Sequence, residues 1–235
     1  MSVFTIERAL QPQGGGSQQL FIVFMDTTEG KDMDAFCQTI AKTFSSAAIV
    51  VATPSDALTH AQALQQEQVL TDEELKTFVS NHHSDIQGFI KAFQAHLKIE
   101  PNATALIGVG QMGALVMELA KLETPLAGRL IGFGTRFAQM PNAALSLEQT
   151  IHLLHARHDK LVDVSYTAKA QEVIAHFEGD ATIDVAHQAK DSFNQTLVQQ
   201  MVQRLLTCVP LRYWKEAQNA QVLDAAPAEK GEAIH

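Results

Sequence analysis

The sequence predicts an α/β fold, in which a mostly parallel central sheet carries helices on both faces. Short apolar runs, rich in β-branched and aromatic residues, alternate along the chain with stretches of helical periodicity. Of the 235 residues, 46% are hydrophobic and 18% are charged, which is typical of a globular protein with a substantial core. We expect one domain over residues 1–223 and a flexible tail over residues 224–235.

Each expected strand is an apolar run of about 4–8 residues, the usual length of a buried strand. These runs cover residues 3–9, 20–25, 48–52, 103–109, 130–134, 151–155 and 182–186. Helical patterns cover residues 31–44, 72–97, 112–122, 166–175, 193–207 and 211–217. Thr71 offers an N-cap to the second helix, and the acids that follow it favour the helix dipole. Ligands of parallel sheets bind at the carboxyl ends of the strands, so the residues after each strand are the candidates for a site.

Charge and cysteine content limit the partners and the compartment. The net charge of -9 argues against a nucleic-acid partner, because phosphate binding needs clustered Lys and Arg. Cys37 and Cys208 form no disulfide framework, which suits a reducing compartment. No segment has the roughly 20 apolar residues of a membrane span, and the first residues lack the pattern of a signal peptide. We therefore expect a cytoplasmic protein that binds an unknown small molecule or protein, with a homodimer as one option.

Neither a metal nor a cofactor is predicted. His152, His155 and His158 recur at three-residue spacing. Residues three apart on a strand point to opposite faces, so His152 and His155 should not share a metal.

A glycine-rich turn between the strand at 103–109 and the helix at 112–122 is the most informative segment. Gly108, Gly110 and Gly113 form a G-x-G-x-x-G pattern, which in this context is compatible with a dinucleotide site. No acid stands at the end of the next strand to hold a ribose hydroxyl, but Arg136 could meet a 2′-phosphate. An NADP site is therefore one alternative. A glycine-rich elbow with no ligand is the interpretation we favour.

The same turn can also be compared with the G-x-S-x-G nucleophile elbow, which lifts a serine above a sheet. From Asn102 to Ala217 the chain resembles the bacterial carboxylesterase/phospholipase-like small serine esterases, which are relatives of the acyl-protein thioesterases. The resemblance rests on residues 102–108, 126–129, 151–155, 159, 162–163, 209–210, 213 and 216–217. It implies the α/β-hydrolase fold and, for an intact member, hydrolysis of carboxylic esters.

The resemblance also implies that the catalytic residues have been lost. The nucleophilic serine of the family corresponds to Gly110, and its catalytic acid corresponds to Asp159. A gapless placement puts Asp191 at the position of the catalytic histidine. The oxyanion-hole region corresponds to Asp26 and to Gln111, the residue after the nucleophile position. A carboxylate at Asp26 would repel an oxyanion, so we interpret the chain as a pseudoenzyme that binds a ligand or partner.

A residual hydrolase is the other alternative, since His187 lies near the missing histidine and could act as a substitute base on water. If the hydrolase fold holds, Asp26, Gly110, Asp159 and Asp191 should lie together at the carboxyl edge of the sheet. Mutual repulsion of the three carboxylates would then raise the pKa of at least one of them.

Overall fold

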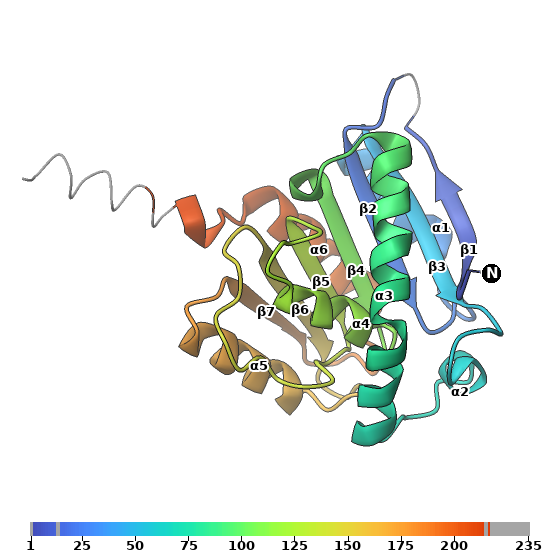
Figure 1. The fold of residues 1–235 in the computed structure, drawn as a ribbon, viewed down its shortest axis with the longest axis vertical. Helices are drawn as coiled ribbons and strands as arrows, with labels where there is room; N and C mark the ends of the chain where they lie inside the picture. The colour runs from blue at the N-terminus through green and yellow to red at the C-terminus, as the bar shows by residue number, and fades with distance from the viewer. Residues whose placement is uncertain (1, 13–14, 214–215, 217–235) are drawn as a thin grey trace, which may run out of the picture.

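The protein is built on one seven-stranded sheet with the strand order β1-β3-β2-β4-β5-β6-β7 (Figure 1). This computed structural model describes residues 2–12, 15–213 and 216. The strands are β1 Phe4–Leu10, β2 Gln19–Met25, β3 Ala47–Pro54, β4 Thr104–Val109, β5 Arg129–Phe133, β6 Thr150–Ala156 and β7 Ala181–Ala186. All neighbouring strands pair in parallel except β1, which runs antiparallel to β3 at the edge. The predicted α/β fold with a mostly parallel sheet is confirmed.

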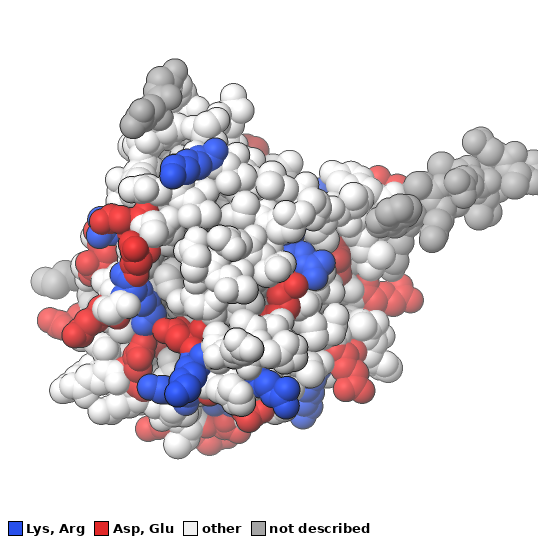
Figure 2. Space-filling model, turned by 180° about the vertical axis from the view of Figure 1, so that it is seen from behind, with Lys and Arg blue, Asp and Glu red and all other residues white. Residues whose placement is uncertain are grey.

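Helices cover both faces of the sheet, as predicted. They are α1 Met33–Thr43, α2 Ala61–Gln65, α3 Asp72–Leu97, α4 Gly113–Glu118, α5 Ser165–His176 and α6 Gln195–Thr207, with 3₁₀ turns at Pro101–Ala103 and Leu119–Lys121. In Figure 1, α3, α4 and α5 lie in front of the sheet and α1 and α6 behind it. The front helices share one buried apolar cluster with the sheet, and the back helices share a second. Over the face seen in Figure 2, basic side chains are interspersed with acidic ones.

Strand register decides which residues meet at the carboxyl edge of the sheet. Met25 pairs with Val109 at the ends of β2 and β4, and Val109 pairs with Phe133 at the end of β5. The residues that follow these strands therefore leave the sheet side by side. Because β2, β3 and β4 are buried on both faces, a register shift of one residue would move their side chains into the opposite apolar cluster and disrupt its packing.

Several predicted elements differ in length from those observed. The helix expected at 112–122 ends as α4 at Glu118 and continues as a 3₁₀ turn. The five-residue α2 was not predicted, because it is too short to show a helical period. The helix expected at 211–217 is helical at 211–213 and at 216, and its other residues lie outside the described part of the chain, as does the expected tail at 224–235. Among the described residues, no helix has the length and apolar character needed to cross a membrane.

Candidate functional site

The turn after β4 is a tight strand-to-helix elbow built around Gly110. Gly110 has φ +66°, in the left-handed region that favours glycine, and its backbone N–H donates to the Phe133 carbonyl at 3.0 Å. Gly108 and Gly113 pack directly against each other, and a Cβ on Gly108 would collide with the Gly113 backbone. The close approach of strand and helix explains Gly108 and Gly113, and the left-handed backbone explains Gly110. No nucleotide is needed to account for them.

The carboxylate of Asp26 occupies the space above Gly110. The backbone N–H of Gln111 donates to Asp26 Oδ2 at 2.9 Å, and that of Met112 donates to Asp26 Oδ1 at 2.6 Å. A Cβ on Gly110 would lie 2.9 Å from Asp26 Cγ and closer still to Oδ2. Asp26 therefore fills the room that a side chain at Gly110 would need. It also accepts the backbone donors at the start of α4 that an oxyanion or a phosphate would use.

Burial dominates the ionisation of Asp26, which is only 3% exposed. Desolvation raises its pKa from 3.8 to about 7, against the lowering effects of the Gln111 and Met112 amides and of Lys31. Glu67 adds a smaller rise. A raised pKa was expected here, but from repulsion among three site carboxylates. The physical cause is instead the removal of the carboxyl group from water.

Asp159, the expected catalytic acid, is bound by its own loop and by Ser192. Its Oδ1 accepts the N–H groups of Leu161 and Val162, and its Oδ2 accepts both the N–H and the hydroxyl of Ser192. The Ser192 Oγ also accepts the backbone N–H of Ala156 at 2.8 Å. Ser192 is buried, and it makes the contact to the acid that a catalytic histidine would make.

Ser192 was not predicted from the sequence, and this residue, rather than the neighbouring Asp191, contacts Asp159. Asp191 is exposed, and its Oδ1 accepts the N–H of Phe193 in the same turn. The inward position belongs to Ser192. The sequence signal that could have identified Ser192 is a small polar residue directly before the apolar Phe193 and the N-cap residue Asn194.

His187, the suggested substitute base, is exposed after the end of β7. Its side chain makes no hydrogen bond to any residue in the described part of the chain. A histidine base is held in place by a partner on its second ring nitrogen in the serine hydrolases, and His187 has none among these residues. The geometry thus gives no support to His187 as an oriented base.

The site residues surround a cavity of about 20 Å³, room for about one water molecule. Asp26, Gly110, Asp159 and Asp191 all line it, so the structure brings together the four residues that the resemblance placed at one edge. The remaining lining residues are Lys31, Glu67, Val109, Phe133, Gly134, Leu161, Ser192 and Phe193.

The loop after α2 contributes Glu67 to the wall of this cavity and is held in place by Gln111. Lys31 Nζ binds Glu67 Oε1 at 2.7 Å. The Gln111 side chain donates to the Gln68 carbonyl and accepts from the Leu70 N–H, both at 2.6 Å. Gln111 therefore serves as a brace for the loop, while its backbone N–H is taken by Asp26.

Arg136, proposed to bind a 2′-phosphate in the NADP alternative, is engaged within the protein. Its Nη1 binds Asp72 at 2.6 Å, and its guanidinium stacks over the Tyr166 ring at 4.8 Å. The amides that would cradle a pyrophosphate are occupied by Asp26. Among the described residues, no group of three or more His, Cys, Asp and Glu side chains has the arrangement of a metal site.

Comparison with known proteins agrees with this architecture. The chain is 34% identical over 128 residues to Esterase YpfH of Escherichia coli, and the match covers 54% of this chain and 55% of the esterase. The chain thus spans about half the length of the curated relative that it matches. In structure it resembles esterase PE8, with a TM-score of 0.68 at 15% identity, over 86% of this chain and 98% of that one. It also resembles a carboxylesterase of Bacillus cereus, with a TM-score of 0.62 at 11% identity, over 83% of this chain and 91% of that one.

These two structural likenesses show the α/β-hydrolase fold. The family follows from the sequence, since residues 61–209 match the phospholipase/carboxylesterase family along more than half of the chain. The chain belongs to the phospholipase/carboxylesterase family and has the esterase fold of that family.

Proposed function

We propose that this chain is a non-hydrolytic member of its family, in which the former catalytic centre has become a structural junction. The observation that carries the proposal is the Asp26 carboxylate, which accepts the Gln111 and Met112 amides directly above Gly110. A substrate carbonyl has no nucleophile to meet there and no free donors to polarise it. Ser192 in contact with Asp159 supports the same conclusion, since a hydroxyl is no general base at neutral pH.

The expected loss of activity is large. Removing the serine nucleophile alone lowers kcat by roughly 2 × 10⁶ in a serine protease. The loss of one oxyanion donor lowers it by about 10²- to 10³-fold in the same class of enzyme. The effects of substitutions within one catalytic unit are not additive, so the two losses cannot be multiplied. The roughly 2 × 10⁶-fold figure is therefore the lower bound of the expected loss in kcat. Turnover should therefore be indistinguishable from background.

The inherited cavity also gives little room for a ligand. About 20 Å³ is far below the roughly 300–1,000 Å³ of usual small-molecule sites. A binding function of this chain is therefore better sought elsewhere on the fold.

Ester hydrolysis and serine labelling test the proposal together. The chain would be assayed with p-nitrophenyl acetate and butyrate and exposed to a fluorophosphonate probe, with Esterase YpfH as the reference and heat-unfolded chain as the blank. We expect no turnover and no labelling above the blank. Stoichiometric labelling of one serine, with turnover lost in parallel, would show a rearranged active site and overturn the proposal.

A further inference from the structure

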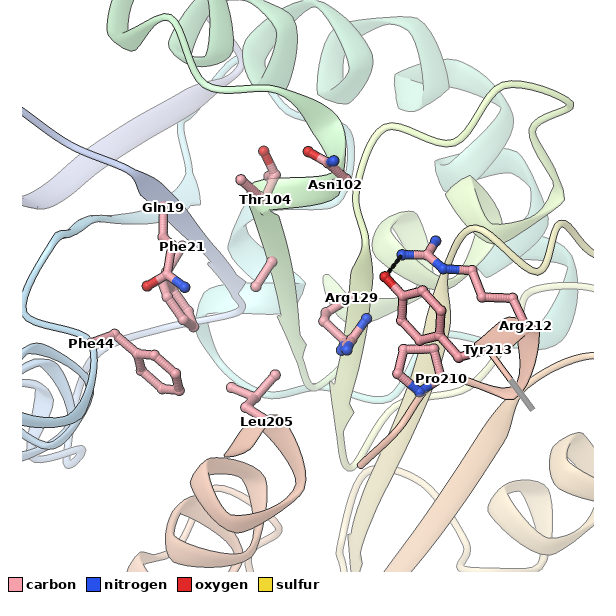
Figure 3. A pocket seen from close by; sticks show the side chains of 12 residues that line it. Gln19, Phe21, Phe44, Asn102, Thr104, Arg129, Leu205, Pro210, Arg212 and Tyr213 are labelled. Carbon is pink, nitrogen blue, oxygen red and sulfur yellow. Dashed lines mark hydrogen bonds between the residues drawn. The ribbon is translucent and has the colours of Figure 1, made fainter. Parts of the chain in front are cut away.

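A second and larger cavity lies at the amino edge of the sheet, the edge away from Gly110 (Figure 3). Its volume is about 290 Å³, near the lower end of the usual range for small-molecule sites. The first residues of three neighbouring strands line it, namely Gln19 of β2, Thr104 of β4 and Arg129 of β5. The end of α6 and residues 210–213 complete its wall.

Arg129 is the distinctive charge of this cavity. In the described part of the chain it forms no ion pair with a carboxylate, and its one hydrogen bond runs from Nη1 to the Gly128 carbonyl at 2.9 Å. Burial lowers the pKa of its guanidinium. An arginine carries five N–H donors in a planar fork, so most of them remain available. Figure 3 shows the guanidinium lying inside the cavity between the strands and residues 210–213.

The position of Arg129 is fixed by the backbone before it. The N–H of Gly128 donates to the carbonyls of Pro101 at 2.8 Å and Thr104 at 3.1 Å. A Cβ on Gly128 would lie 2.6 Å from the Asn102 carbonyl oxygen, so this close approach requires glycine. The arginine thus starts from a rigid junction of β4 and β5, which suits a binding site better than a mobile loop does.

The opposite wall of the cavity is largely apolar, with the Gln19 amide at its side (Figure 3). Phe21, Phe44 and Leu205 line it, and the two phenylalanine rings pack together with centroids 5.2 Å apart. Arg212 is also present, but it is held by Glu148 at 2.7 Å and donates to the Tyr213 hydroxyl at 3.2 Å. Among the described residues, the cavity therefore combines a cation that forms no ion pair, although Asp180 acts on it from a longer distance, with an apolar surface.

We propose that this cavity binds a small organic carboxylate with an apolar body. The carboxylate pairs with the guanidinium of Arg129, in the two-pronged geometry that arginine favours, and the hydrocarbon chain packs against Phe21, Phe44 and Leu205. Partial burial of the Arg129 cation favours binding of a carboxylate, because the carboxylate replaces the water that the guanidinium loses on burial. The site does not depend on the state of the elbow around Gly110, at the other edge of the sheet.

Calorimetric titration of the full chain with hexanoate tests this site, with hexanol as the uncharged probe of the same length. We expect saturable 1:1 binding of hexanoate and at least tenfold weaker binding of hexanol. Arg129→Met should weaken hexanoate binding at least tenfold, while Arg129→Lys should keep part of it. Arg157→Met is the matched control: Arg157 is exposed after β6, at the other edge, and its loss should leave binding unchanged.

A second variant keeps the test decisive if Arg129→Met fails to fold. Leu205→Trp fills the apolar end of the cavity and leaves both arginines in place, so it should also abolish hexanoate binding. The proposal is overturned by any of four results: no saturable binding of hexanoate, equal binding of hexanol, hexanoate binding unaffected by a folded Arg129→Met or Leu205→Trp, or inorganic phosphate bound more tightly than hexanoate.

Discussion

Replacing Asp26 by asparagine should remove a pH-dependent loss of stability that the wild-type carboxyl group causes. The pKa of Asp26 is about 7 in the folded chain, against 3.8 for an ordinary aspartate. Between these two values the folded state holds a proton that the unfolded state has released. The free energy of unfolding therefore falls as the pH rises, by about 1.4 kcal/mol per pH unit for one proton. The stabilising contribution is complete below pH 3.8 and is lost as the pH rises through 7.

The size of this effect follows from the same two values. A rise in pKa from 3.8 to about 7 corresponds to about 4 kcal/mol of stability between the protonated and the ionised limits. His152 acts in the opposite direction, because burial lowers its pKa from 6.5 to about 4, so its contribution is lost as the pH falls. The pH dependence of the wild-type free energy of unfolding therefore contains contributions from both Asp26 and His152. The difference between Asp26→Asn and wild type isolates Asp26.

Urea unfolding of both proteins at about pH 5 and about pH 8 measures this difference. Asparagine offers only one carbonyl oxygen to the Gln111 and Met112 amides, which should lower stability by about 1–3 kcal/mol at every pH. On top of that constant loss, the variant should gain about 3 kcal/mol relative to wild type from the lower to the higher pH. Asp56→Asn removes an exposed carboxylate and should follow the wild-type curve. Parallel curves for Asp26→Asn and wild type would refute the burial argument.

Two further predictions concern the residues around Asp26. Gly110→Ser should give no esterase activity, and it should destabilise the chain by more than the roughly 1–2 kcal/mol that a non-glycine residue costs in the left-handed region, because the new side chain meets Asp26. Adding Asp26→Gly should recover part of this loss of stability. The control Gly88→Ser, which lies in open space on α3, should be nearly neutral. A Gly110→Ser variant as stable as wild type would contradict the close contact. Ser192→Ala should lower the free energy of unfolding by about 1–3 kcal/mol, since Asp159 and the Ala156 N–H both lose a buried partner, whereas Ser84→Ala on the exposed face of α3 should not. Equal urea midpoints for these two serine variants would show that the Ser192 contact contributes nothing.

The fold and the gathering of the site residues could be predicted because they depend on where apolar runs end. The strands β2 and β4 stop at Met25 and Val109, so Asp26 and Gly110 leave a parallel sheet as neighbours. No side-chain detail is needed for that conclusion. The role of Asp26 was harder to predict, because its effect depends on which amides it reaches. Repulsion of an oxyanion was expected, whereas the carboxylate occupies the donors themselves.

Loop geometry and long-range packing explain what could not be predicted. Whether Asp191 or Ser192 faces Asp159 depends on how the turn before α6 is closed, and one residue of slip exchanges an exposed side chain for a buried one. The cavity at the amino edge joins Phe21, Arg129 and Leu205 from three distant segments. Phe21 and Leu205 carry no local motif, and Arg129 belongs to a stretch, 126–129, that indicated only the family, so only the assembled sheet reveals that the three residues share a surface.

The contacts around Gly110 also show what a serine-hydrolase site would require at this edge of the sheet. A serine at that position meets Asp26, so the nucleophile requires a change after β2 as well as after β4. A histidine in place of Ser192 must fit a position that is 2% exposed, where a Cβ on Gly134 would already lie 2.7 Å from the serine side chain. Each single reversal therefore introduces a collision before it supplies any chemistry. Because three segments would have to change together, the loss of catalysis that we propose rests on the packing of the site and not on one missing hydroxyl.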